Sequence, residues 1–231
     1  MNQTITFGSI EIKYRLQYAD RKSLGISVNS DMEVSVKAPE GTSLEKIKEK
    51  IKKKAPWIIK QQSYFLSFHP KTPARKFISG ETHLYLGRQY SLKVIKGKDE
   101  SVKLIGKFIE IITMDKQNAG RLLIDWYLMN AKSKFPLIAK PLIEKFAKYK
   151  VEPSAIFLKK MSTRWGSCTP KGNIILNPEL IRASKGCIEY VIIHELCHLV
   201  HLNHTQKFID LQTKEMPDWK KWKMRLEKLL A

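Results

Sequence analysis

Apolar and polar residues alternate along the N-terminal part of the chain. Between residues 3 and 38 this alternation falls into three runs separated by turn-forming residues. Successive side chains of a strand point to opposite faces, so the pattern predicts three β-strands with one apolar face each. Gly8-Ser9 interrupts the first run and is expected to form a turn or a bulge.

A lysine-rich segment follows, from about residue 43 to residue 66. Apolar residues recur every three or four positions from Leu44 to Ala55, and lysines fill most of the positions between them. This spacing predicts an amphipathic helix, which Pro56 is expected to break or restart. The helix is the best candidate surface for an anionic partner, although a solvated helix face carries the same pattern.

The pattern changes twice more towards the middle of the chain. Short apolar runs separated by glycines fill residues 75–113 and predict a β-meander. Residues 117–148 have helical spacing, and Pro136 and Pro141 are expected to kink or divide the helix. Its apolar side is predicted to consist of Leu122, Leu123, Trp126, Met129 and Ala131.

The remaining pattern completes an α+β fold. Residues 155–161 and 173–176 are short strand candidates, and helical segments follow to the end of the chain. We therefore expect a β-rich N-terminal region, residues 1–115, which includes the lysine-rich helix. A C-terminal α+β domain is expected over residues 116–231.

The strongest chemical signal lies within residues 190–204. An apolar run leads directly into H-E-L-C-H at residues 194–198. Positions i and i+4 share one face of a helix, so His194 and His198 can bind a single metal ion. Glu195 lies beside them, where a carboxylate can take a proton from water. Buried helical histidines are often only core residues, but four of the six histidines fall between 194 and 204, which favours a metal site.

Two histidines compete for the place of third ligand. His204 lies six positions after His198 and reaches the same ion only if the chain turns. Asn203 is suitably placed for such a turn, because asparagine tolerates the left-handed backbone that ends many helices. His201 would lie on the ligand face if the helix continued. We favour His204, because a ligand that returns from a turn completes a tetrahedron better than three in a row.

The composition gives the net charge of the chain and, through its cysteines, bears on whether disulfides are expected. The chain has 42 Lys+Arg against 22 Asp+Glu, a formal net charge of +20. Such an excess permits binding to nucleic acid, anionic membrane or acidic protein, although solvated lysines account for it equally well. The three cysteines have no close pair spacing, which argues against a disulfide framework, and Cys197 is interpreted as a small buried apolar residue.

No targeting pattern is visible in the sequence. The first residues lack a basic region followed by an apolar run, and no apolar run approaches the roughly 20 residues of a membrane span. A cytoplasmic protein with no membrane partner is therefore expected. The oligomeric state is left open.

Several segments together resemble the YgjP-like metallopeptidase family, which is related to the SprT-like and WLM zinc proteases. They are T-R-W-G-S-C at residues 163–168, N-I-I-L-N-P at 173–178, Y-V-I-I-H-E-L-C-H at 190–198, and Asn203-His204. The run V-S-V-K-A-P at 34–39, with Trp57 downstream, also looks like this family. The resemblance covers most of the chain.

The resemblance implies a zincin-like metallopeptidase domain at the C-terminal end. It implies one zinc ion per chain, held by His194, His198 and His204. It also implies that Glu195 is the catalytic residue and that the substrate is a peptide or a protein.

Two further expectations concern the surroundings of the metal. The resemblance implies that the strand Asn173-Ile174-Ile175-Leu176 lies on the edge of the sheet above the metal. Such an edge could bind an extended peptide through main-chain hydrogen bonds. The segment Arg164-Trp165-Gly166-Ser167 is interpreted as a packing and turn element near that strand.

The leading hypothesis is therefore zinc-dependent hydrolysis of peptide bonds, with Glu195 as general base. A second hypothesis is a nucleic-acid-associated protein whose protease acts on DNA-bound proteins, which the charge and the related families suggest. A third is a zinc-stabilised module without turnover. Glu195 argues against the third, because a purely structural site does not need a carboxylate beside its ligand.

Overall fold

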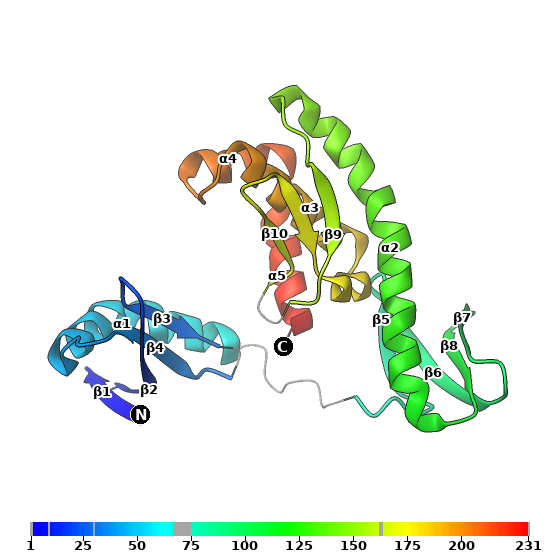
Figure 1. The fold of residues 1–231 in the computed structure, drawn as a ribbon, viewed down its shortest axis with the longest axis horizontal. Helices are drawn as coiled ribbons and strands as arrows, with labels where there is room; N and C mark the ends of the chain where they lie inside the picture. Colours follow the sequence, from blue (N-terminus) through cyan, green and yellow to red (C-terminus); the bar gives the residue numbers. More distant parts are fainter. Residues whose placement is uncertain (1, 9, 30, 67–74, 162–163, 231) are drawn as a thin grey trace. The chain divides into compact units, whose positions relative to one another are not determined.

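Strands and helices are present throughout the chain, which confirms the predicted α+β class (Figure 1). The computed structural model describes residues 2–8, 10–29, 31–66, 75–161 and 164–230. The chain divides into two compact units, residues 1–73 and residues 74–230.

The first unit is a four-stranded sheet with one helix. Its elements are β1 (Asn2–Phe7), β2 (Ile10–Ala19), β3 (Gly25–Val28), β4 (Val34–Pro39) and α1 (Leu44–Leu66). The strand order is β1-β2-β4-β3, with β2 and β4 parallel and both outer pairs antiparallel. The structure has four strands where three were predicted, because the first run folds back as the β1–β2 hairpin. Gly8 follows β1 with a φ of 60°; Ser9 lies outside the described residues.

Helix α1 covers the apolar face of this sheet. Its side chains Ile47, Ile51, Ala55 and Ile58 are buried in one core with residues of β1, β2 and β4. Ile26 and Val28 of β3 are partly buried and pack against this core. Pro56 lies inside α1 and does not end it, so the predicted break is wrong. Pro56 is exposed while its neighbours on the apolar side are buried. That packing holds the helix together on both sides of the missing N–H group.

The second unit begins with another four-stranded sheet. Its strands are β5 (Thr82–Tyr85), β6 (Arg88–Lys96), β7 (Ser101–Ile105) and β8 (Phe108–Thr113). The order is β5-β6-β8-β7 with β6 and β8 parallel, so the predicted meander is wrong. Strand β8 contributes Ile109 and Ile111, both fully buried, whereas Leu104 and Ile105 of β7 are 40% and 51% exposed. The more apolar strand therefore lies inside the sheet and β7 lies at its edge.

A 28-residue helix, α2 (Ala119–Phe146), follows the short 3₁₀ turn η1 (Lys116–Asn118). Pro136 and Pro141 lie inside it on its exposed side and do not divide it. Its buried residues are Ala119, Leu123, Tyr127, Ala131, Phe135, Ala139 and Phe146. Met129, predicted to lie on the apolar side, is 69% exposed, because the buried stripe repeats every four residues from Ala119.

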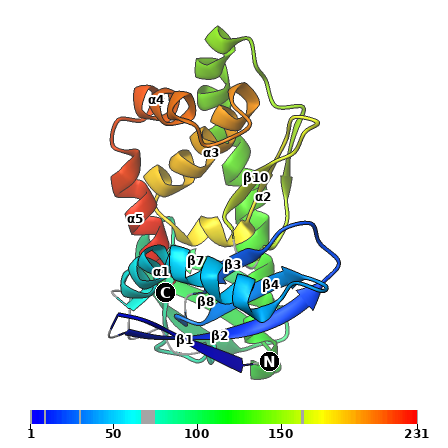
Figure 2. The same cartoon turned by 90° about the vertical axis from the view of Figure 1, so that its left-hand side faces the viewer.

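The C-terminal part combines a small sheet with three helices (Figure 2). Its elements are η2 (Ala147–Tyr149), β9 (Ala155–Leu158), β10 (Gly166–Cys168), β11 (Asn173–Leu176), η3 (Pro178–Arg182), α3 (Lys185–Val200), α4 (Gln206–Glu215) and α5 (Trp219–Leu230). Helix α3 packs against α2, α4, α5 and β10. Glycine at position 186 lets α5 pack closely against α3, because a Cβ there would lie only 2.6 Å from the Trp222 ring. In the described part of the chain, no helix has the length and apolar character of a membrane span.

The sheet β5–β8 shares its core with the C-terminal helices. Leu92 and Ile109 of the sheet belong to the same buried cluster as Leu123 of α2 and Ile192 of α3. The predicted boundary between residues 115 and 116 falls between β8 and α2, inside this second unit. Long helix α2 connects the two layers, since it packs on β7 and β8 and also on α3.

A buried carboxylate ties α4 to the end of α2. The Glu215 side chain is 1% exposed and lies 3.1 Å from Lys145 Nζ and 2.8 Å from Lys148 Nζ. The Tyr149 hydroxyl donates a hydrogen bond to it, and Lys145 Nζ donates to the main-chain carbonyl of Glu215 at 2.8 Å. Burial opposes ionisation, but the hydrogen bonds from Lys148, Tyr149 and Lys145 prevail and lower the pKa of Glu215 to about 2.

Replacing Glu215 by Gln is expected to lower the free energy of unfolding near pH 7 by about 3 kcal/mol. The folded pKa lies below the ordinary value of 4.5, so this stabilisation is present above about pH 4.5 and is lost as the pH falls towards 2. Urea unfolding followed by circular dichroism at several pH values measures it. Glu144→Gln, at an exposed position of α2, is the control and should change stability by less than about 0.5 kcal/mol. The same pH dependence in wild type and Glu215→Gln would contradict this assignment.

Candidate metal centre

Helix α3 carries the first two candidate ligands and ends soon after them. Its last residue is Val200, and His201 adopts an extended backbone with φ −133° and ψ 107°. The His201 N–H still donates to the Cys197 carbonyl at 2.8 Å and so closes the last turn. The last helical residue thus lies two positions after His198. His201 would share the ligand face only if the helix continued, and it does not.

The chain then turns back towards α3. The N–H of Thr205 donates to the carbonyl of Asn203 at 2.7 Å, and α4 begins at Gln206. Asn203 is not among the described residues with positive φ, so the expected left-handed turn at this residue is wrong. The extended backbone of His201 ends the helix instead.

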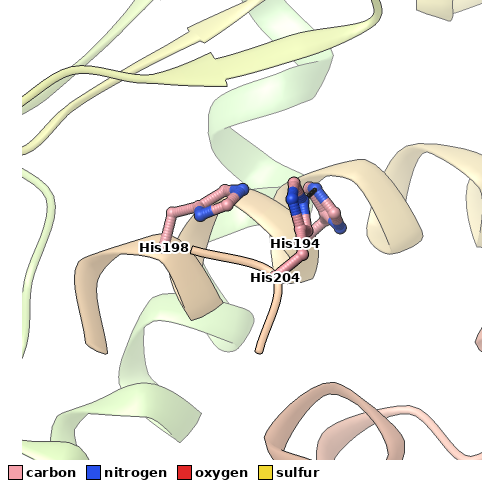
Figure 3. A group of neighbouring side chains, drawn as sticks. All are labelled: His194, His198 and His204. Carbon is pink, nitrogen blue, oxygen red and sulfur yellow. Dashed lines mark hydrogen bonds between the residues drawn. The ribbon is translucent and has the colours of Figure 1, made fainter. Parts of the chain in front are cut away.

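The three predicted ligands converge (Figure 3). One ring nitrogen from each of His194, His198 and His204 lies within 4.8 Å of the other two. The ring centroids are 4.9 Å, 5.0 Å and 4.7 Å apart for the pairs 194–198, 194–204 and 198–204. Within the described ranges, this is the one group of three or more His, Cys, Asp or Glu side chains that could hold a metal ion, and the His201 ring is not part of it.

Hydrogen bonds on the far side of two rings orient them. His194 Nδ1 lies 2.9 Å from the Gln212 side-chain oxygen, and His198 Nδ1 lies 3.3 Å from the His201 carbonyl oxygen. Both oxygens can only accept, so each Nδ1 donates its proton and each Nε2 keeps a free lone pair. Histidines that bind metals are commonly held in this way.

The three nitrogens are close enough together to share a metal ion. His204 Nε2 and His194 Nε2 are 3.0 Å apart. Burial lowers the pKa of His194 to about 4 and also lowers the pKa of His198, so both rings are neutral near pH 7. A ring N–H of His204 can donate to the His194 lone pair at this distance, and a metal ion bound by both nitrogens would take the place of that proton. Two nitrogens bound to one tetrahedral zinc ion would lie about 3.3 Å apart.

A buried phenyl ring supports all three imidazoles from one side. The Phe208 ring centroid lies 5.0 Å, 4.7 Å and 4.7 Å from those of His194, His198 and His204. Phe208 is 2% exposed, whereas His204 is exposed. The group therefore has an apolar support on one side and remains accessible to solvent at His204.

Glu195 lies against the strand β10. It is 4% exposed, and a Cβ at Gly166 would lie 2.5 Å from Glu195 Oε1 and 2.8 Å from Val191 Cγ1. Only glycine therefore lets β10 approach α3 so closely. Burial raises the pKa of Glu195 to about 7, against the opposing effects of the Arg164 charge and a hydrogen bond from the Cys168 N–H. The segment interpreted as a packing and turn element thus also surrounds this carboxylate.

The strand β11 is not an edge strand, and the prediction that Asn173-Ile174-Ile175-Leu176 forms the sheet edge is wrong. The order is β10-β11-β9, with β11 antiparallel to β10 and parallel to β9. Both edges of its main chain are thus paired, and Ile174 and Leu176 are fully buried. In the central place, β11 is the most deeply buried of the three strands. The edge beside Glu195 is β10.

Four residues that contribute to the site were not predicted to do so. They are Gln212, Phe208, Gly166 and Asn177. The Asn177 side chain donates to the carbonyls of Met161 and Arg164 at 2.8 Å and 3.2 Å, and so holds the segment that leads into β10. Gly166 and Asn177 lie in the family-like segments, which is a signal that could have found them. Gln212 and Phe208 carry no sequence signal of this kind.

The combination of an H-E-x-x-H helix, a third histidine from the following loop and a buried glutamate is typical of metal-dependent hydrolases. The family model described as YgjP-like, metallopeptidase domain matches residues 22–229. The chain therefore belongs to the YgjP-like metallopeptidase family, which confirms the resemblance seen in the sequence. A comparison with curated proteins found no match. Family membership indicates a metal-dependent peptidase.

The His204→Ala variant is expected to lose stoichiometric metal, because one of the three converging nitrogens is removed. The His201→Ala variant is the matched control and should keep about one Zn²⁺ per chain, because only the main-chain carbonyl of His201 contacts a ligand. Elemental analysis after loading with Zn²⁺ and dialysis measures both. Full zinc content in His204→Ala, or its loss in His201→Ala, would contradict the assignment of the third ligand.

Proposed function

We propose that the protein is a zinc-dependent metallopeptidase that hydrolyses peptide bonds, with Glu195 as general base. The convergence of the three imidazoles beside a buried glutamate is the observation that carries this proposal. Membership of the YgjP-like metallopeptidase family supports the broader class.

Zinc is the ion that the donor set favours. Three neutral imidazoles are a common ligand set of catalytic zinc sites, which keep a fourth position for water or substrate. When bound, zinc lowers the pKa of water and polarises the carbonyl group of the substrate. His194, His198 and His204 would hold it, with Gln212 and the His201 carbonyl fixing the orientation of two of the rings.

Glu195 is suited to move the proton in this reaction. Its carboxylate would accept a proton from the attacking water and pass it to the leaving amine. The two transfers require a group that both takes and releases a proton near neutral pH. The pKa of Glu195, raised to about 7 by burial, meets this requirement. The adjoining Cys168 N–H and Arg164 charge favour the ionised form, which is the form that acts as a base.

Among the described strands, none pairs with the outer edge of β10, and this edge is the proposed place for an extended peptide. Thr169 N–H donates to the Asn173 carbonyl, and Asn177 N–H donates to the Trp165 carbonyl. Because antiparallel pairs alternate, the main-chain groups of Gly166 and Cys168 point away from β11. The carbonyl of Cys168 and both main-chain groups of Gly166 are therefore proposed to pair with a substrate strand, whereas the Cys168 N–H lies close enough to Glu195 to lower the pKa of its carboxyl.

The rival interpretation as a purely structural zinc module is less well supported. Structural zinc sites use four protein ligands. Among the residues with a described position, no fourth His, Cys, Asp or Glu joins the group of His194, His198 and His204. An ion held there would keep a position for another ligand.

The Glu195→Gln variant is expected to keep its metal and its fold but to lose at least about 100-fold in kcat, because the amide cannot accept the proton. A pool of internally quenched fluorescent peptides incubated with the Zn²⁺-loaded protein measures cleavage. Glu189→Gln is the control on the same helix; that residue pairs with Lys185 at 3.5 Å and should tolerate the change. Undiminished cleavage by Glu195→Gln at normal zinc content would refute the base assignment.

A further inference from the structure

In the first unit, a groove runs along the helix α1, beside the segment that leads into β3 and the start of that strand. It consists of two adjoining depressions of about 400 Å³ and 200 Å³, which share Leu24 and Lys50 in their linings. We call it the lysine groove, because five lysines and one tryptophan lie in its lining. These residues are Lys22, Lys46, Lys50, Lys53, Lys54 and Trp57. All six lie in the first unit, and the groove is separate from the residues of the metal centre.

The charge of the groove is strongly positive. Its five lysines are exposed, and the one carboxylate in the lining, Glu49, pairs with Lys53 at 2.8 Å. Lys46, Lys50, Lys53, Lys54 and Trp57 follow one another at helical spacing on α1, so they lie along one side of the helix. From Lys46 to Trp57 this row covers about 16 Å of helix axis. A row of cations of this length matches an extended polyanion better than a single small anion.

Trp57 distinguishes this groove from an ordinary solvated helix face. The apolar side of α1 is used by the core, where Ile51 and Ile58 are fully buried. Trp57 is instead 41% exposed on the lysine side, in a depression that it shares with Leu24, Ile26 and Lys54. Binding sites for single-stranded nucleic acid combine exposed aromatic rings with a row of cations, because the rings stack with bases while the cations bind the phosphate backbone.

Other anionic partners fit the groove less well. An anionic membrane would need a free apolar helix face, and that face of α1 is buried against the sheet. An acidic peptide could pair with β3, the edge strand of the sheet, but β3 has only four residues. Such a peptide would also leave the exposed face of the Trp57 ring without a stacking partner.

We propose that the lysine groove binds single-stranded nucleic acid, with its lysines on the phosphates and Trp57 stacked with a base. This binding site stands independently of the proposed peptidase activity. Together the two would let one chain recognise a nucleic acid and cleave a peptide bond.

The test uses the full chain and a fluorescein-labelled oligodeoxythymidylate of about 15 nucleotides, followed by fluorescence anisotropy at several salt concentrations. The double variant Lys46→Ala/Lys50→Ala removes two groove lysines. Its matched control is Lys52→Ala/Lys60→Ala, which removes two exposed lysines of α1 outside the groove. Circular dichroism verifies that each variant is folded.

The groove variant is expected to bind about 10-fold more weakly or worse, and the slope of log K against log salt should fall by about 1.4. The control should change the affinity less than 3-fold. Trp57→Ala should weaken binding about 10-fold through loss of stacking, and Trp57→Phe should recover part of it.

Four outcomes would overturn the proposal. They are absence of binding at low salt, equal losses in the two double variants, no effect of Trp57→Ala, and tighter binding of duplex than of single-stranded DNA. Displacement of the oligonucleotide by polyglutamate or by phosphatidylserine vesicles at equal charge concentration would assign the groove to an acidic protein or a membrane, and would also overturn it.

Discussion

The contact between α4 and α3 is the constraint on which the candidate metal centre depends. Phe208, Gln212 and Glu215 lie four and three positions apart, so they share one face of α4, and all three are buried. Phe208 packs against the three imidazoles, Gln212 accepts from His194 Nδ1, and Glu215 pairs with Lys145 at the end of α2. The loop that carries His204 joins α3 to α4, so the docking of α4 also brings the third imidazole to the first two.

A second close approach places the glutamate. Helix α3 is buried on most of its surface, and a strand can lie against Glu195 only where it has no side chain, which is the position of Gly166. The same contact lowers the solvation of the carboxylate and raises its pKa to about 7. The contact between Gly166 and Glu195 therefore determines both where the glutamate lies and how readily its carboxyl exchanges a proton. The edge of β10 is placed beside it by the same contact.

Much of this site could be predicted from the sequence, because its signals are local. The i and i+4 positions of His194 and His198 require only a helix, and the apolar run before them predicts one. The choice of His204 needed a turn, which the sequence indicated correctly although it attributed the turn to the backbone of Asn203. Gln212 and Phe208 could not be predicted, because their roles arise from a contact between two helices and leave no periodic pattern.

The fold was predicted to the level of its elements, and the errors concern helix continuity and strand order. Pro56 was expected to break or restart its helix, and Pro136 and Pro141 were expected to kink or divide theirs. Both helices continue through these prolines, because burial of the opposite face compensates for the missing hydrogen bonds. The positions of β8 and β11 inside their sheets depend on which strands pair, and sequence order does not reveal this pairing. The connectivity of β1–β4 followed by α1 recurs in β5–β8 followed by α2, although the two sequences show no repeat. This recurrence becomes visible only once the pairing of the strands is known.

We propose that His194, His198 and His204, and no other side chains, hold one ion. X-ray absorption at the zinc K-edge of the Zn²⁺-loaded protein is the measurement that decides it. Three imidazole nitrogens are expected at about 2.0–2.1 Å, together with one further light atom that does not belong to an imidazole. A sulfur neighbour near about 2.3 Å, as a cysteine such as Cys197 would give, or a fourth imidazole such as that of His201, would contradict it.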